Sequence, residues 1–435
     1  MQISTAFMVF LLMFILMFIL RMPIPMGMMT ACVFYFLTNG SIADTKMVAQ
    51  QTLKTFYTNY TIIAVPLFIF AANVMNSGQV TDKVFGFAKG FVGRFKGGLG
   101  HVNVLASLVF SGMTGSAIAD ASGLGKMEID AMRAEGYDDG FSCAITAASA
   151  TIGPIFPPSI PMVIYSMLSG ASVGALFMGG MVPGVLLALA LMVYVAIFAN
   201  KRNYPRSQKV GVGDFLRYTF NAIPAILTPV ILLVGIYTGI MTPTEAGAVA
   251  GLYALVISVV AYRVLSWKGF LQVLVDTVKG TGSVSIIIGA ATTISYIVAK
   301  EHLAATVGMF ITSFTDNKYI FLLIVNISIL ILGMFIDTSV IQVVFIPIVL
   351  PLAKQFGIDL VHFGLVVIFN MMIGLSTPPF GMLLFITSGI SGTPLKDVIK
   401  EIWPALFTML VVLVIITYFP DVVLFLPRVF MDYAG

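Results

Sequence analysis

The sequence predicts an all-α polytopic membrane protein built as an inverted repeat, with five crossings and one re-entrant hairpin in each half. Of its 435 residues, 59% are hydrophobic and only 10% are charged, far outside the range of soluble domains. Many windows supply the roughly 20 mainly apolar residues that a membrane-crossing helix requires. These runs are continuous rather than alternating, so helices are predicted and a β-barrel is not.

Apolar runs between charged breaks predict ten crossings, over residues 3–20, 24–39, 61–76, 140–168, 174–199, 219–240, 244–265, 281–299, 360–388 and 402–419. Two further apolar stretches, 98–134 and 319–354, are interrupted by glycine and polar residues and predict the hairpins. Segments 41–58 and 268–279 are more polar and amphipathic, which predicts helices that lie at the membrane surface.

The basic residues predict the orientation. With both termini outside the cytoplasm, 17 of the 23 basic residues are cytoplasmic, and the exceptions are Lys46, Lys54, Lys300, Lys318, Lys354 and Arg428. This asymmetry follows the positive-inside rule. No basic residue precedes the first apolar run, so we expect that run to be a membrane helix and not a cleaved signal peptide.

Three pairs of motifs recur at one spacing of 221 positions: Gly112-Met113 with Gly333-Met334, Ile152-Gly153 with Ile373-Gly374, and Pro157-Pro158 with Pro378-Pro379. The repeats are therefore residues 1–217 and 218–435. Since each contains an odd number of crossings, the second is inverted relative to the first. Inverted repeats are a common architecture of secondary transporters, whose sites lie between the repeats near the membrane midplane.

The first half of a candidate site combines a hairpin tip at 110–120 with a proline-rich break at 151–159. Pro154, Pro157 and Pro158 force the crossing helix to unwind, and unwound backbone survives at membrane depth only if protein or a polar cavity covers it. Freed carbonyls and the hydroxyls of Thr114, Ser116 and Ser159 suit a hard cation such as Na⁺. A nearby helix N-terminus suits an anionic group.

The second half of the site combines a tip at 332–339 with a break at 373–379. Asp337 is its sharpest feature, because a carboxylate at membrane depth marks an ion or substrate path by default. The structural alternative is a proline kink with Asp337 capping a helix. Two matched tips and two matched breaks favour the functional interpretation.

Other polar residues have simpler interpretations. Asp120 lies one helical turn behind the first tip, where it orients the loop or contacts the ligand. A solvated cytoplasmic arm is predicted for Lys126, Glu128, Asp130 and Arg133. Thr242-Pro243-Thr244-Glu245 matches a capping box and predicts a helix start. Cys32 and Cys143 fall in apolar segments and predict small buried side chains.

Enzymatic function is not expected. Gly170-Ala-Ser172-Val-Gly174 matches the nucleophile-elbow pattern, but no strand precedes it. Gly125-Lys126 lacks the remaining residues of a phosphate-binding loop, so the energy must come from an ion gradient or a partner. No organic cofactor and no nucleic-acid partner are expected.

The chain resembles the large membrane subunit of tripartite ATP-independent periplasmic (TRAP) transporters, of the DctM type. The resemblance covers essentially the whole chain and is carried by the segments Ser111–Asp120, Ile152–Pro161, Met181–Gly184, Gly239–Gly247 and Gly374–Gly381.

This resemblance implies an elevator-type carrier in the bacterial inner membrane that imports a sialic acid or a four-carbon dicarboxylate with Na⁺. It also implies a small four-helix membrane subunit and a periplasmic substrate-binding protein. Residues 61–168 and 281–388 would form the transport domain. Residues 1–60, 174–279 and 402–435 would form the scaffold. A symporter that works without a binding protein is the alternative, and a membrane-embedded serine hydrolase using Ser172 is a more remote one.

The resemblance also implies ligands. One Na⁺ site would comprise Gly112, Thr114, Gly115, Ser116, Gly153 and Pro154. A second would comprise Gly333, Asp337, Thr338, Gly374 and Thr377. The substrate would lie near Ser116, Asp120, Pro158, Ser159, Asp337 and Ser376.

Overall fold

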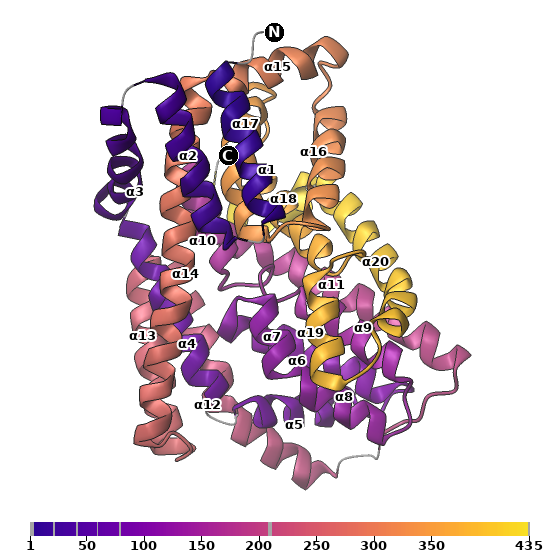
Figure 1. The fold of residues 1–435 in the computed structure, drawn as a ribbon. Coiled ribbons are helices and arrows are strands. Elements are labelled where there is room, and N and C mark those ends of the chain that lie inside the picture. Colours follow the sequence, from indigo (N-terminus) through magenta and orange to yellow (C-terminus); the bar gives the residue numbers. More distant parts are fainter. Residues whose placement is uncertain are drawn as a thin grey trace.

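The structure, a computed structural model, describes residues 4–20, 22–40, 42–58, 60–77, 80–207 and 211–433. Within these ranges the regular elements are all helices (Figure 1), and the only strand-like pairing is one isolated bridge between Lys96 and Arg206. The predicted all-α polytopic class is confirmed.

The first half of the chain contains α1 (Thr5–Ile19), α2 (Ile24–Asn39), η1 (Ile42–Thr45), α3 (Lys46–Thr58), η2 (Tyr60–Ile63), α4 (Ala64–Ser77), α5 (Val80–Val92), α6 (Gly98–Thr114), α7 (Ala117–Gly123), α8 (Gly125–Ala134), α9 (Asp139–Ala150), α10 (Ile160–Ser169) and α11 (Val173–Lys201). The second half contains α12 (Val212–Tyr237), α13 (Pro243–Val256), η3 (Ile257–Ala261), α14 (Trp267–Lys300), α15 (Leu303–Phe314), α16 (Lys318–Gly333), α17 (Thr338–Gln355), α18 (Leu360–Leu375), α19 (Met382–Ser391), α20 (Leu395–Tyr418) and α21 (Pro420–Met431).

Membrane-spanning character is clear for seven described helical segments that are long and apolar enough to cross a bilayer: 60–77, 173–201, 212–237, 243–261, 267–300, 338–355 and 395–418. Several predicted crossings are shorter or broken. Helices α1 and α2 have 15 and 16 residues, and the predicted spans 140–168 and 360–388 are divided at their prolines into α9/α10 and α18/α19.

Some helix boundaries differ from the prediction. The expected surface helix 268–279 and the expected crossing 281–299 are one continuous helix of 34 residues, α14. A change from polar to apolar side chains does not end a helix unless a breaker accompanies it. Helices α5, α15 and α21 are additional short elements. The expected surface helix 41–58 is found as η1 and α3, and α3 has no buried residue.

Helix starts recur at the spacing of the sequence motifs. Ser116 and Asp337 are the N-caps of α7 and α17, and Asp138 and Asp359 are the N-caps of α9 and α18. Each pair differs by 221 positions. The two halves also interlock. The Tyr165 ring of α10 lies against Gly364 of α18, and its hydroxyl donates to the Leu360 carbonyl at 2.7 Å.

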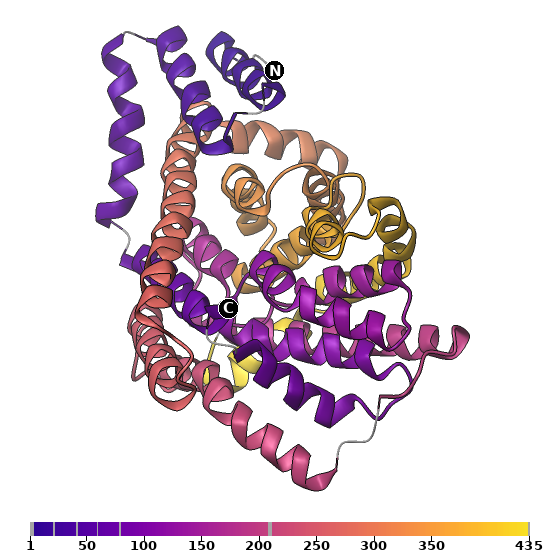
Figure 2. The ribbon, with the colours of Figure 1, turned by 60° about the horizontal axis from the view of Figure 1, so that its bottom comes forward.

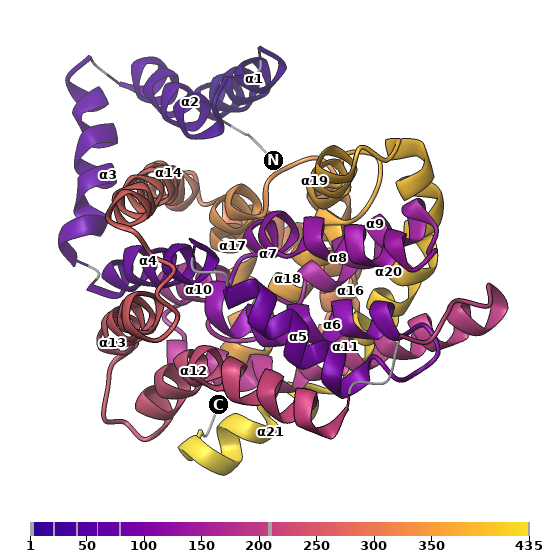
Figure 3. The same ribbon diagram turned by 90° about the horizontal axis from the view of Figure 1, so that it is seen from below.

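The helices fall into two groups. Helix α14 packs along α2, α3 and α4 at one side of the molecule, whereas α6 to α9 pack with α19 and α20 on the other (Figure 3). Figure 2 shows α14 running along this side of the molecule. The first hairpin belongs to the second group, whereas α17 of the second hairpin packs on α14.

An ion cluster joins the halves at the end of α11. The Arg202 guanidinium contacts Asp138 at 3.0 Å and Glu401 at 2.7 Å, and the Tyr204 hydroxyl donates to Asp138 at 2.6 Å. Partial burial opposes the charge of Arg202, but hydrogen bonds with Tyr204 and Glu401 outweigh it and raise the pKa of Arg202. The start of α9, the end of α11 and the start of α20 are thereby fixed together.

We expect Glu401→Gln to lower the thermal stability of the purified protein, because it leaves a partly buried guanidinium without one of its two carboxylates. The expected cost is about 1 to 3 kcal/mol. Asp421→Asn is the matched control, since Asp421 contacts Arg428 at a similar 2.6 Å but is 85% exposed, and exposed pairs contribute little. Equal melting temperatures for the two variants would contradict the assigned role of this cluster.

Candidate functional site

The first hairpin tip is a glycine turn between two helices. Helix α6 ends at Thr114, and Gly115 has a φ of 61°, a conformation that glycine adopts at little cost. Ser116 then caps α7, its hydroxyl accepting from the Ala119 amide at 3.4 Å. Thr114 is buried. Its hydroxyl donates to the Phe110 carbonyl at 3.5 Å, which leaves its oxygen lone pairs available as acceptors.

The first break, residues 151–159, separates α9 from α10. Its prolines supply no backbone donors. Ser159 ends the break and caps the helix that follows. Its hydroxyl donates to the Pro154 carbonyl at 2.5 Å and accepts from the Met162 amide at 3.3 Å. Pro157 and Pro158 are both buried, so the break lies inside the protein and not on an outer rim facing lipid.

The tip and the break are in direct contact. A Cβ atom on Gly115 would overlap the Pro158 carbonyl, and one on Gly153 would lie 3.3 Å from the Ser116 carbonyl oxygen. The structure therefore brings Gly115, Ser116 and Gly153 together. Gly112 lies at the edge of this group, where an added Cβ would be 3.8 Å from the Pro157 carbonyl oxygen.

The second tip and break make a similar contact. Helix α16 ends at Gly333, whose backbone lies so close to Gly374 that an added Cβ on Gly374 would be 2.7 Å from the Gly333 Cα. Asp337 is half-buried and caps α17, with Oδ1 accepting from the Ser339 amide at 2.9 Å. The Thr377 hydroxyl donates to the Ile373 carbonyl at 2.7 Å. Thr338 is buried as the first residue of α17.

The second break also reaches the first half of the chain. The fully buried Ser376 donates from its hydroxyl to the Ala147 carbonyl of α9 at 3.2 Å. The two breaks differ in how far their residues are buried, however. Pro379 is exposed and Phe380 is 58% exposed, and the Phe380 ring lies 5.7 Å from the ring of Phe335 beside the second tip.

A cluster of polar side chains lies behind the first tip. Asp120 and Glu128 are each 1% exposed, so the prediction that Glu128 belongs to a solvated arm is wrong. Gly125, Glu128, Ile129 and Met132 form the buried stripe of α8, at the i, i+3, i+4, i+7 spacing of a buried helix face. That spacing was the signal in the sequence. Asp130 and Arg133 are solvated, as predicted.

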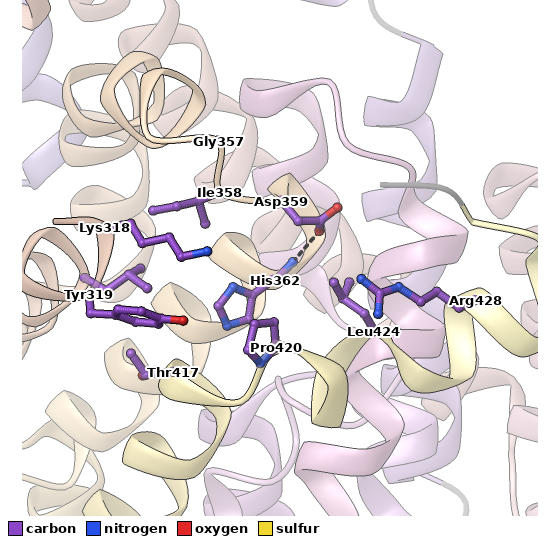
Figure 4. A pocket seen from close by; sticks show the side chains of 11 residues that line it. Lys318, Tyr319, Gly357, Ile358, Asp359, His362, Thr417, Pro420, Leu424 and Arg428 are labelled. Atoms are coloured by element: carbon purple, nitrogen blue, oxygen red, sulfur yellow. Dashed lines mark hydrogen bonds between the residues drawn. The ribbon is translucent and has the colours of Figure 1, made fainter. Parts of the chain in front are cut away.

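A cavity of about 180 Å³ lies far from the tips (Figure 4). Its lining includes Lys318, at the start of α16, whereas the tip follows the other end of that helix. The separation along α16 is about 22 Å at 1.5 Å per residue. Asp359 accepts hydrogen bonds here from the Val361 and His362 amides and from the Tyr433 hydroxyl. This cavity contains none of the predicted site residues.

Two simpler predictions are confirmed, the capping box and the two buried cysteines. Thr242 and Glu245 form a capping box at the start of α13. Ser172 caps α11, with its hydroxyl accepting from the Ala175 amide at 3.3 Å, so its role in the structure is that of a helix cap. Cys32 and Cys143 are buried free thiols.

Comparison with known proteins identifies a family. The family model described as "Tripartite ATP-independent periplasmic transporter, DctM component" matches residues 11–422. The sialic acid TRAP transporter large permease protein SiaM of Vibrio cholerae is 41% identical over 93% of this chain and 94% of its own length. The sialic acid TRAP transporter permease protein SiaT of Haemophilus influenzae is 39% identical over 98% of this chain and 69% of its own.

A further relative is named for another substrate. The C4-dicarboxylate TRAP transporter large permease protein DctM of Pseudomonas aeruginosa is 37% identical over 88% of this chain and 90% of its own length. Among solved structures, the YdaH transporter of Alcanivorax borkumensis has a similar fold, with a TM-score of 0.53 at 14% identity over 85% of this chain and 88% of that one.

We expect Gly115→Ala to destabilise the protein more than Gly170→Ala. Both glycines follow a helix with a left-handed φ, 61° and 79°, so both variants carry similar backbone strain of roughly 1 to 2 kcal/mol. The Cβ at position 115 would also overlap the Pro158 carbonyl, whereas a Cβ at position 170 would have no atom of the described residues within 4 Å. Overlap typically adds about 1 to 3 kcal/mol. Thermal unfolding checks this, and equal losses would argue against contact between tip and break.

Proposed function

Because this chain belongs to the DctM family of tripartite ATP-independent periplasmic transporters, we propose that it is the large membrane subunit of a carrier that imports a small organic acid with Na⁺. The contact between each glycine tip and its proline break is the observation that carries this proposal. Irregular backbone and hydroxyl groups lie inside the protein there, with the half-buried Asp337 beside them, and such an arrangement is typical of the ion and substrate sites of transporters.

Sodium coupling has a physical rationale in these residues. The first Na⁺ site would use carbonyl and hydroxyl oxygens of Gly112, Thr114, Gly115, Ser116, Gly153 and Pro154. The second would use Gly333, Asp337, Thr338, Gly374 and Thr377. Asp337 would repel an anionic substrate nearby. A bound Na⁺ removes that repulsion, so the acid and the ion bind more favourably together than separately.

The substrate is proposed to be a sialic acid or a four-carbon dicarboxylate, the classes for which three relatives are named. Ser116, Pro158, Ser159, Asp337 and Ser376 would surround it, with Asp120 behind Ser116. Ser159 caps α10, and the amides at a helix N-terminus favour a carboxylate. The relatives are transport proteins by name, in agreement with the expectation that this chain is not an enzyme.

We propose an elevator mechanism in which the hairpins and broken helices move against a scaffold. The 221-residue recurrence of motifs and N-caps supports the inverted repeat on which this mechanism rests. The proposed boundary near residue 280 falls inside α14, and a continuous helix cannot be divided between moving bodies. We therefore assign α14 as a whole to the scaffold, with α2 and α3. Because α14 also packs on α4 and α17 of the proposed transport domain, the moving interface would run along these contacts.

The proposed setting is the bacterial inner membrane, with both termini periplasmic, as the positive-inside rule suggests. The partners would be a four-helix membrane subunit and a periplasmic binding protein. This chain covers 69% of the length of SiaT, so that longer permease has room for a second membrane subunit.

Reconstitution tests the function directly. Proteoliposomes containing this chain and the small subunit should accumulate labelled sialic acid or dicarboxylate only with the binding protein and an inward Na⁺ gradient. Accumulation by the chain alone would favour the stand-alone symporter. Accumulation without Na⁺ would contradict sodium coupling.

Asp337→Asn should abolish Na⁺-dependent uptake and leave membrane insertion unchanged. Asparagine caps helices as well as aspartate does, so the variant removes the charge and keeps the start of α17. Asp359→Asn is the matched control, because it changes a second aspartate N-cap in the same half. Measured at saturating binding protein, control uptake should be close to wild type. Full sodium coupling in Asp337→Asn would contradict the second ion site.

A further inference from the structure

Two carboxylates are buried together in the first hairpin. Asp120 of α7 and Glu128 of α8 are each 1% exposed, and they interact electrostatically as like charges. Neither oxygen of Asp120 has a hydrogen-bond partner of normal geometry among the described residues, and the same holds for Glu128 Oε1. Three carboxylate oxygens therefore lie in the protein interior without a donor.

Neutral polar side chains link the two carboxylates. The Asn103 amide donates to Glu128 Oε2 at 2.9 Å and to the Thr146 hydroxyl at 2.7 Å. The Ser149 hydroxyl donates to Asn103 Oδ1 at 2.6 Å, and Ser107 lies 3.2 Å from Ser149.

At the other end of this chain of contacts, the Ser107 side chain lies next to Asp120, although neither Asp120 oxygen has a hydrogen bond of normal geometry with a described residue. Helices α6, α7, α8 and α9 all contribute to the cluster.

An unpaired carboxylate in a low-dielectric interior costs several kcal/mol, so two neighbouring carboxyl groups are neutralised either by protons or by a bound cation. No Lys or Arg takes part in the hydrogen bonds of this cluster among the described residues. Its side-chain ligands are oxygens, which are the donors that hard cations prefer.

We propose that Asp120, Glu128 and Ser107 bind an additional Na⁺ ion, separate from the two sites at the hairpin tips. This inference rests on the proposed sodium coupling. The Asp120 amide donates to the Ser116 carbonyl at 3.0 Å, so the site lies one helical turn behind the first tip. An ion bound there connects the two arms of the hairpin, and Asn103 and Ser149 connect these arms to α9. It therefore stabilises the tip that contacts the first break.

The test counts Na⁺ ions on the reconstituted complex of this chain with its small subunit. Thermal stability is measured against Na⁺ concentration, with choline chloride keeping the ionic strength constant. Above saturation, stabilisation per tenfold rise in Na⁺ is proportional to the number of bound ions. Glu128→Gln and Asp120→Asn should each reduce this slope by about one third, from three ions to two. The Hill coefficient for Na⁺ in uptake should fall as well.

Asp130→Asn is the matched control, because it makes the same change on a solvated residue of α8, and its slope should equal that of wild type. If neither amide variant can be purified, Ser107→Ala is the alternative test. It should raise the Na⁺ concentration for half-maximal stabilisation several-fold.

If Glu128→Gln and Asp120→Asn keep the wild-type slope of stability against Na⁺ concentration, the inference is wrong and the two carboxyl groups are protonated and structural. Sodium coupling at the tips would not be affected by that result. A wild-type complex whose stability and uptake both ignore Na⁺ would instead overturn the proposed coupling itself.

Discussion

Backbone polar groups that leave a helix inside a membrane must be covered by protein, and this constraint determines the arrangement of the site. The prolines of 151–159 free carbonyls that no helix satisfies. Covering them requires a second segment to approach closely, and Gly115 and Gly153 permit that approach because they have no side chain in the way. The glycine tips and the proline breaks thus depend on each other. Neither would be stable in lipid without the other.

The same arrangement concentrates oxygen atoms. Serine and threonine hydroxyls at the tips and breaks bond locally to carbonyls, as Ser159 does to Pro154 and Thr377 to Ile373. Each hydroxyl oxygen then keeps lone pairs that can accept or coordinate. Asp337 adds a formal charge, and its cap on α17 keeps the carboxylate at the tip. Local helix chemistry therefore places the groups that would bind an ion.

Much of this was predictable because it depends on local rules. Proline breaks, glycine turns, capping residues and the 221-residue spacing are visible in the sequence, and so are the residues that meet at each tip. Other features depend on which face of a helix is buried. The charged neighbours of Glu128 predict a solvated residue, although its spacing from Gly125, Ile129 and Met132 places it on the buried stripe of α8. The change of polarity near residue 280 predicts a helix end, but without a breaker there α14 continues through it.

The sequence also could not predict that the two matched breaks are covered differently. Pro157 and Pro158 are buried, whereas Pro379 and Phe380 are exposed beside Phe335. Two segments with similar motifs need not have identical surroundings, because each packs against different helices. In the carrier that we propose, such a difference would matter, since equal exposure of both breaks would open the site to both sides of the membrane at once. Unequal cover of the two breaks would allow one to be closed while the other is open.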